Sequence, residues 1–216
     1  MTGFQWSWSS AADVLPLLLE AFVKVTLVLT VAGSLIAAIL GLVWAFLIRE
    51  LPKPIGAFLS WLVGVVRMTP LPLQAFFVYY IFVQLDLITI GVIVLGIHYS
   101  TYMAESYRAG IESIRGGQWE AATALSLPTF RTWRAVILPQ ALRATLPSLG
   151  NWAIAMFKDT PFLIIIGVGE MVTAAREYGA VQFTYVEAMT IAGLIFLAAS
   201  YPTAILMRKL EKKLEY

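Results

Sequence analysis

Residues 25–48 read VTLVLTVAGSLIAAILGLVWAFLI, a run of 24 residues without a charged side chain. A helix needs about 20 mainly apolar residues to cross the hydrocarbon core of a bilayer. A transmembrane β-strand has about ten residues and alternates with a period of two, which this run does not do. We therefore expect a transmembrane helix here.

Four more stretches of the chain carry the same signal. They are residues 54–85, 87–104, 144–169 and 188–207. The second and fourth contain no charged side chain, whereas Arg67 interrupts the first, and Lys158 and Asp159 interrupt the third. The sequence therefore predicts an all-α integral membrane protein with five transmembrane helices in one membrane domain.

The composition supports this prediction. Hydrophobic residues make up 60% of the chain and charged residues 13%, whereas a soluble domain has about 25% charged residues. An ordinary soluble enzyme or binding module is thereby excluded. The chain has no Cys and one His, so we expect no thiolate or histidine metal site.

Lysine and arginine are distributed unevenly among the segments between the predicted helices. Eleven lie in the first and third connecting segments and in the C-terminal tail: Arg49, Lys53, Arg108, Arg115, Arg131, Arg134, Arg143, Arg208, Lys209, Lys212 and Lys213. The second connecting segment has none, and the fourth has Arg176 with two glutamates. The positive-inside rule then predicts that the N-terminus lies outside and the C-terminus in the cytoplasm. Termini on opposite sides of the membrane require an odd number of spans, and the predicted five meet this requirement.

The first twelve residues precede the predicted membrane domain, which we place at residues 13–213. We expect residues 1–12 on the outer, periplasmic side, where Trp6 and Trp8 suit an interfacial anchor. A disordered tail over residues 1–10 is the alternative.

The third connecting segment, whose central part we place at residues 112–139, is long for so small a membrane protein. Residues 120–127 favour a short helix that follows a flexible Gly116-Gly117 pair. Pro128 is expected to end this helix, and the hydroxyl of Thr129 to cap a second helix over residues 130–138. The pattern predicts a helix–turn–helix at the membrane surface, with an inert interfacial hairpin as the alternative.

This segment resembles the EAA loop of permeases from ATP-binding-cassette (ABC) importers. That pattern is Glu-Ala-Ala, three residues, Gly, nine residues, then Ile-x-Leu-Pro, and it fits residues 120–139 with Ser126 in place of Gly and Val136 in place of Ile. If position 126 adopts a left-handed turn, Ser costs roughly 1 kcal/mol there.

Further motifs resemble the polar amino-acid permeases of this class. They are Arg67-Met-Thr-Pro-Leu71, Tyr102-Met-Ala-Glu-Ser-Tyr-Arg-Ala-Gly-Ile111, Gly117-Gln-Trp-Glu-Ala-Ala122, and Lys158-Asp-Thr160 followed by Gly167-Val-Gly-Glu170. The resemblance covers residues 13–213. Residues 118–133 are also similar to permeases for ectoine and hydroxyectoine uptake.

The resemblance implies a type I ABC importer (MetI-like) transmembrane domain in the bacterial inner membrane, working by alternating access. It also implies three protein partners: a second permease chain, identical or homologous, a cytoplasmic ABC ATPase dimer that holds ATP and Mg, and an extracytoplasmic solute-binding protein. No nucleic acid is expected. The residues implied in ATPase coupling are Glu120, Ala121, Ala122, Leu125, Ser126 and Leu127.

No Gly in this chain is followed by Lys, so the phosphate-binding P-loop is missing. We therefore expect a permease that is not itself an enzyme, with no cofactor of its own. An ion-gradient-driven secondary transporter is the alternative, but those proteins usually contain paired inverted repeats, for which five spans leave no room.

Charges inside the predicted spans point to a polar path, because each costs roughly 2.5–3.5 kcal/mol at mid-bilayer unless it faces a cavity or a partner. Pro70, Pro72 and Pro161 remove backbone hydrogen bonds beside these charges, and broken helices are tolerated where they line a polar path. The predicted pathway residues are Arg67 and Lys158 for a substrate carboxylate, Asp159 and Glu105 for its ammonium group, and Thr69, Gln74, Asn151 and Thr160 for neutral hydrogen bonds. The alternative is that these groups pair with each other at a dimer interface. For His98 we expect a packed ring rather than a proton relay.

Overall fold

The computed structural model describes residues 5–214, which are helical apart from short connections. In chain order the helices are α1 (Trp8–Ala21), α2 (Leu27–Glu50), α3 (Lys53–Met68), α4 (Leu71–Ile81), α5 (Leu87–Glu112), α6 (Gly116–Ala124), α7 (Thr129–Thr132), α8 (Leu138–Asp159), α9 (Met171–Gln182) and α10 (Tyr185–Leu214). One π-helical turn joins α1 to α2 and another joins α7 to α8, while a 3₁₀ segment, Thr160–Ile166, follows α8.

The prediction of five spans is confirmed. Within the described residues, four helical stretches are long and apolar enough to cross a membrane: Trp8–Glu50, Leu87–Glu112, Thr129–Ile166 and Tyr185–Leu214. The fifth is a broken span, because α3 and α4 meet at an angle of 103°. The break lies at Pro70, whose ring excludes a continuous hydrogen-bond ladder.

The closest packing in the fold joins α2 to α5. Every fourth residue of α2 is buried, and most of these residues are small: Leu29, Gly33, Ala37, Gly41 and Ala45. A Cβ atom on Gly41 would lie 2.9 Å from the Cβ of Met103 and 3.0 Å from the backbone nitrogen of Ala104. Small residues at this spacing let two helix backbones approach closely inside a membrane.

A second hydrophobic cluster joins α1, α9 and α10. It consists of Val14, Leu18, Met171, Ala175, Ala188 and Ala192.

Glu170 begins α9 by accepting hydrogen bonds from the backbone nitrogens of Val172 and Thr173. Burial raises the pKa of the Glu170 carboxyl, although these hydrogen bonds act in the opposite direction. At the start of α5, hydrogen bonds from Thr89 hold the pKa of the exposed Asp86 below its usual value.

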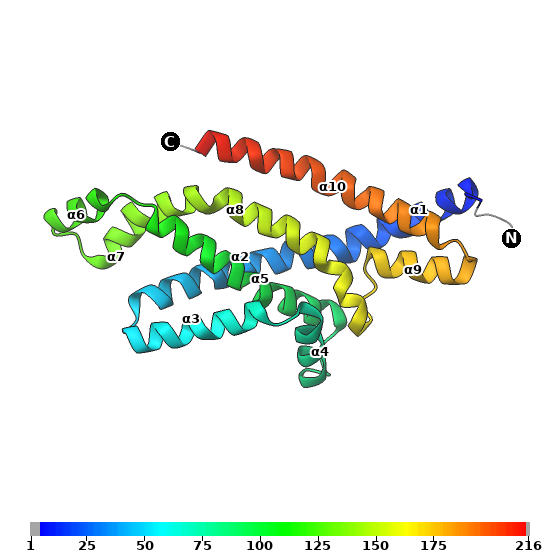
Figure 1. The fold of residues 1–216 in the computed structure, drawn as a ribbon, viewed down its shortest axis with the longest axis horizontal. Helices are drawn as coiled ribbons and strands as arrows, with labels where there is room; N and C mark the ends of the chain where they lie inside the picture. Colours follow the sequence, from blue (N-terminus) through cyan, green and yellow to red (C-terminus); the bar gives the residue numbers. More distant parts are fainter. Residues whose placement is uncertain (1–4, 215–216) are drawn as a thin grey trace.

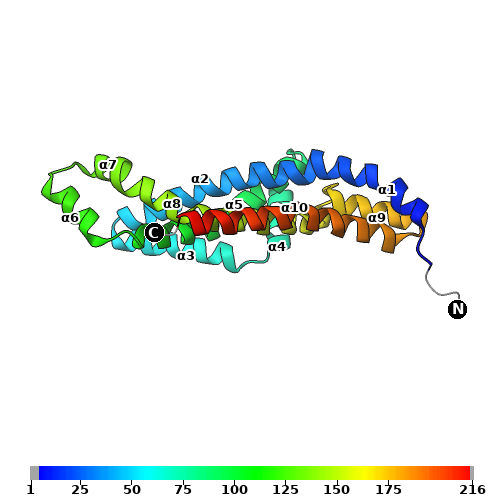
Figure 2. The same ribbon diagram turned by 90° about the horizontal axis from the view of Figure 1, so that it is seen from above.

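The molecule is elongated, and Figures 1 and 2 show the α2–α3 turn, the α6–α7 region and the C-terminal end of α10 at the same end of its long axis. The N-terminal end of α1 and α9 lie at the opposite end. The three basic segments of the sequence therefore share one end of the fold. The direction of insertion stays a prediction, as does the boundary after residue 12, which falls within α1.

Candidate translocation cavity and coupling hairpin

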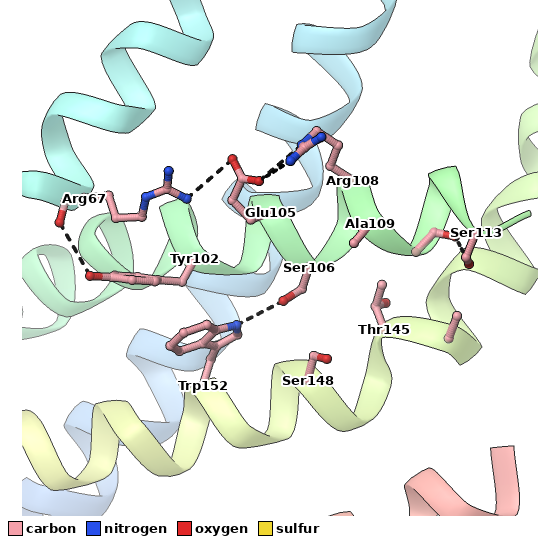
Figure 3. A pocket seen from close by; sticks show the side chains of 12 residues that line it. Arg67, Tyr102, Glu105, Ser106, Arg108, Ala109, Ser113, Thr145, Ser148 and Trp152 are labelled. Carbon is pink, nitrogen blue, oxygen red and sulfur yellow. Dashed lines mark hydrogen bonds and ion pairs between the residues drawn. The ribbon is translucent and has the colours of Figure 1, made fainter. Parts of the chain in front are cut away.

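A polar cavity of about 530 Å³ lies between the C-terminal end of α3, the second half of α5 and the first half of α8 (Figure 3). Its polar and aromatic lining residues are Arg67, Tyr102, Glu105, Ser106, Arg108, Ser113, Thr145, Ser148 and Trp152. Charged side chains lie along α3 and α5, and hydroxyl groups with an indole face them from α8.

The charges in the cavity are arranged around one carboxylate. Glu105 lies 3.4 Å from a guanidinium nitrogen of Arg67 and 2.7 Å from one of Arg108. Arg108 donates hydrogen bonds to Glu105, whereas the Arg67 guanidinium donates none within residues 5–214. Arg67 is therefore the cation of the cavity whose donors are available to an incoming anion.

An aromatic wall bridges α5 and α8 beside these charges. The rings of Tyr102 and Trp152 are 4.7 Å apart, and the Trp152 indole nitrogen donates a 3.0 Å hydrogen bond to the hydroxyl of Ser106. This contact fixes the indole plane at the edge of the cavity.

The bend between α3 and α4 is held by one side chain. The amide nitrogen of Gln74 donates to the carbonyl oxygens of Val66 at 2.7 Å and Thr69 at 3.0 Å. These carbonyls lie at the end of α3, where the helix breaks, so they lack the usual partners in a next turn. The Val66 carbonyl also accepts the backbone N–H of Thr69 at 3.2 Å. The Thr69 hydroxyl likewise donates to a carbonyl of α3 at 2.7 Å.

The same side chain orients His98. With its nitrogen committed to two carbonyls, the Gln74 amide presents its oxygen to the Nδ1 atom of His98, 3.3 Å away. Nδ1 must then carry the proton of this hydrogen bond. His98 is buried among Tyr99 and Tyr102, which agrees with the expected packed ring.

The charges at the end of α8 take separate directions, as adjacent residues on a helix do. The Tyr99 hydroxyl donates a 2.7 Å hydrogen bond to Asp159, and the buried Thr160 hydroxyl donates to the carbonyl of Phe157. Lys158 is exposed and has no ion pair within residues 5–214. Asn151 is also exposed and lies outside the cavity lining.

The structure thus brings together two of the predicted pathway residues, Arg67 and Glu105, and sets Gln74 and Thr69 at the bend beside them. Asp159 and Thr160 lie at the far end of α8, and Asn151 and Lys158 on its outer face. Their pathway roles stay predictions. Sequence reasoning missed seven of the polar and aromatic lining residues: Tyr102, Ser106, Arg108, Ser113, Thr145, Ser148 and Trp152. The spacing of four between Tyr102 and Ser106, and between Ser148 and Trp152, is the signal that could have found two facing helix stripes.

The segment between α5 and α8 differs from its predicted form in two respects. Its first helix, α6, spans 116–124 rather than 120–127, so both glycines are helical. Thr129 is the first residue of α7 and makes no capping hydrogen bond, because Pro128 occupies the N-cap position. The second helix then continues through a π-helical turn into α8, so α6 is connected directly to a membrane span.

Ser126 adopts the left-handed conformation considered for this position, with φ of 50°. Its nitrogen donates to the carbonyl of Thr123, and the Leu127 nitrogen donates to the carbonyl of Ala122. These two bonds form a Schellman motif, in which glycine is the usual left-handed residue. The departure from Gly in the loop pattern therefore falls where the conformation is least favourable for a side chain.

The predicted coupling residues differ in exposure. Glu120, Ala121, Leu125 and Ser126 are exposed and Leu127 is half-buried, whereas Ala122 is buried and packs α6 against the rest of the hairpin. Leu125 and Phe130 are both 73% exposed, so an apolar tip protrudes beside the turn. Phe130 was not among the predicted coupling residues.

The base of the hairpin is anchored by aromatic packing. The ring of Trp133 contacts those of Trp119 at 5.7 Å and Phe46 at 5.4 Å between centroids, and it packs with Ile111 and Ile137 in a small core. The hairpin therefore packs against α2 through Phe46 and against α5 through Ile111.

Residues 15–216 match the family described as "Binding-protein-dependent transport system inner membrane component". The chain belongs to this family. It is a multi-pass permease of the inner membrane, and the spacing of its loop pattern and the five-span fold are those expected of such a subunit.

Named relatives agree over nearly the whole chain. The permease is 35% identical to "Probable amino-acid ABC transporter permease protein y4tG" of Sinorhizobium fredii (strain NBRC 101917 / NGR234), over 95% of this chain and 93% of that protein. It is 32% identical to "Glutamine transport system permease protein GlnP" of Escherichia coli (strain K12), over 98% of this chain and 99% of that protein.

A solved structure described as "Crystal structure of an amino acid ABC transporter with histidines" superimposes with a TM-score of 0.87 at 31% identity, covering 97% of the permease and 100% of that chain. An inward-facing MetNI methionine ABC transporter shares the fold, with a TM-score of 0.76 at 17% identity, covering 88% of the permease and 93% of that chain. The expected MetI-like fold is confirmed. These relatives are ABC permeases and give no support to the ion-gradient alternative.

Proposed function

We propose that this permease passes a zwitterionic polar amino acid through the inner membrane, and that the substrate meets the cavity beside Arg67. The supporting observation is the group of Arg67, Glu105 and Arg108 in one cavity. A substrate carboxylate would find the guanidinium of Arg67, which lies 3.4 Å from Glu105 but donates no hydrogen bond within residues 5–214, and its ammonium group would find Glu105. A volume of about 530 Å³ is in the range of small-molecule sites.

The names of relatives support an amino acid as the cargo, since they include an amino-acid permease and a glutamine permease. Ectoine is a second candidate, because residues 118–133 resemble ectoine permeases and ectoine also combines a carboxylate with a delocalised cation. Both candidates need the same pair of charges in the cavity.

Energy for transport would come from a separate ATPase dimer that binds ATP and Mg, since this chain has no P-loop. The apolar tip at Leu125 and Phe130, beside Glu120, is the surface we assign to contact with the ATPase. A movement of α6 would pass through the continuous helix of α7 and α8 to one wall of the cavity. An extracytoplasmic binding protein would deliver the substrate from the other side.

A second permease chain would cover the outer face of α8. Asn151 and Lys158 are exposed there, seven residues or about two helical turns apart, and a lysine facing lipid costs roughly 2.5–3.5 kcal/mol at mid-bilayer. Because the chain has no Cys, Asn151→Cys provides a clean test. We expect a disulfide-linked dimer in membranes from this variant. The matched variant Trp61→Cys, on an exposed face of α3, should stay monomeric on gels. A monomer in both would favour pairing with a homologous chain.

The proposed transport is tested by reconstituting the permease with its ATPase in liposomes and adding the binding protein. Uptake should require ATP and the binding protein, and it should survive an ionophore. A thermal-shift screen of the binding protein against amino acids and ectoine then identifies the cargo.

Arg67→Gln tests the cavity itself. We expect its kcat/KM for uptake to fall about 10- to 100-fold, which is the loss of one hydrogen bond to a charged group. The matched variant Arg176→Gln, on an exposed part of α9, should transport normally. Unchanged uptake in Arg67→Gln would place the substrate path elsewhere.

A further inference from the structure

A basic groove adjoins the translocation cavity, with which it shares Ser113 and Ala144, where the start of α6, the first turns of α8 and the end of α10 come together. Its volume is about 560 Å³. The residues that matter are Ser113, Arg115, Gln118, Gln140, Arg143 and Leu214. No acidic side chain within residues 5–214 lines it. Figure 1 shows the C-terminal end of α10 beside α8, at the end of the molecule that carries α6.

Within residues 5–214, the two arginines of this groove have no acidic partner. Within the described part of the chain, neither Arg115 nor Arg143 has a carboxylate oxygen within 4.0 Å, in contrast to Arg49, Arg67 and Arg108. A guanidinium group offers five donors in a planar fork that matches the oxygens of a phosphate. The groove therefore has the charge and the donors of an anion site, and no anion of its own among residues 5–214.

The walls of the groove are held together by amide groups. The Gln140 amide nitrogen donates to the Gln118 side-chain oxygen at 3.3 Å and to the carbonyl of Val136 at 2.7 Å. This contact joins α6 to α8 across the groove. The side chains around the two arginines are thus positioned in the absence of a ligand.

The position of the groove favours a lipid as the source of the anion. Arg143 immediately precedes the uncharged residues 144–157, and on α10 the uncharged residues 188–207 give way to Arg208 and Lys209. The groove therefore lies where the apolar spans end, at the depth of the headgroups. Ala144 and Leu214 add an apolar wall, which a soluble phosphate would not use and an acyl chain would.

We propose that this groove binds the phosphate of an anionic phospholipid, with Arg115 and Arg143 as its ligands. Basic pockets between the ends of transmembrane helices are sites where acidic headgroups bind. The bound lipid would join the coupling hairpin to the ends of α8 and α10. This assignment does not depend on the identity of the transported substrate.

The test uses the full-length permease, delipidated in detergent and titrated with phosphatidylglycerol, phosphatidylcholine or soluble glycerol phosphate. Native mass spectrometry counts the molecules retained on each chain. We expect tight retention of phosphatidylglycerol and weak retention of the other two. Affinity should fall about fivefold for Arg115→Gln or Arg143→Gln alone, and roughly 25-fold for both together.

The matched control is the double variant Arg131→Gln and Arg134→Gln, which removes the same charge from the same segment but not from the groove. It should retain phosphatidylglycerol as the unmodified permease does. Equal losses in both double variants would overturn the proposal in favour of diffuse attraction to basic loops. Unchanged binding in the groove variants would overturn it outright, and tight binding of glycerol phosphate would replace the lipid with a soluble phosphate.

Discussion

The guanidinium carbon of Arg49 lies 4.8 Å from the centroid of the Trp119 ring and 5.9 Å from that of Trp133. Arg49 lies in the last turn of α2, Trp119 lies in α6, and Trp133 begins the π-helical turn into α8. The Arg49 side chain therefore connects the end of a membrane helix to both sides of the hairpin that α6 and α7 form. Contacts of this kind contribute about 0.5–2 kcal/mol, enough to bias the position of a short hairpin without determining the fold.

Arg49→Ala is therefore expected to loosen the hairpin while leaving the permease folded. The ATPase should still copurify, because the exposed tip is unchanged, but less substrate should be taken up per ATP hydrolysed. The measurement is the ratio of uptake to phosphate release in the same liposomes. Lys53→Ala removes a basic residue from the same turn and should leave this ratio unchanged. If both variants transport with normal coupling, Arg49 has no mechanical role.

Ser126→Gly is expected to stabilise the permease. The left-handed conformation of Ser126 is unfavourable for a residue with a Cβ by roughly 1 kcal/mol, and glycine removes this penalty. The apparent melting temperature in detergent should rise by a few degrees, as expected for about 1 kcal/mol in a protein of this size. Ser113→Gly, at a serine with ordinary helical φ, should not raise it. A lower melting temperature for Ser126→Gly would contradict the assigned turn.

Much of the fold could be predicted because the apolar runs are long and because Pro70 breaks one of them. The extension of the first helical span back to Trp8 could not be predicted, because Asp13, Glu20 and Lys24 interrupt the apolar pattern there. Helix α9 was missed for a related reason. Its sequence is polar, and its stability comes from the cap at Glu170 and from packing against α1 and α10.

The residues of the candidate site could be predicted only in part, because a sequence shows local patterns and not contacts between distant helices. A charged residue within an apolar run is recognisable in the sequence, so Arg67 and Lys158 could be predicted as candidate pathway residues. Which charge meets which depends on how helices far apart in the chain pack, and the contact between Trp152 and Ser106 gives no local signal. Thr129 was misassigned because Pro128 can itself begin a helix from the N-cap position.

The close approach of α2 and α5 predicts opposite effects for two similar substitutions. Gly41→Ala would place a Cβ within 3.0 Å of backbone and side-chain atoms of α5, and overpacking of this kind costs about 1–3 kcal/mol. Gly64→Ala, in α3, meets no atom within 4 Å and should add up to about 1 kcal/mol through helix propensity. Melting temperatures of the two variants should therefore move in opposite directions. Equal shifts would show that α2 and α5 can separate without loss.

The bend at Pro70 depends on Gln74, because its amide satisfies two carbonyls at the broken end of α3. Gln74→Leu keeps a side chain of similar size but removes both donors and the acceptor for His98. The Thr69 carbonyl would then lose its Gln74 donor, which costs about 1–3 kcal/mol in an apolar setting, while the Val66 carbonyl would keep the backbone N–H of Thr69. We expect a clear fall in melting temperature and reduced uptake, since Arg67 precedes the bend by only three residues. Gln182→Leu, at an exposed glutamine at the end of α9, provides the control and should behave as the unmodified permease does. If the two variants melt together, the bend is maintained by proline alone, and the orientation of His98 has no bearing on the cavity.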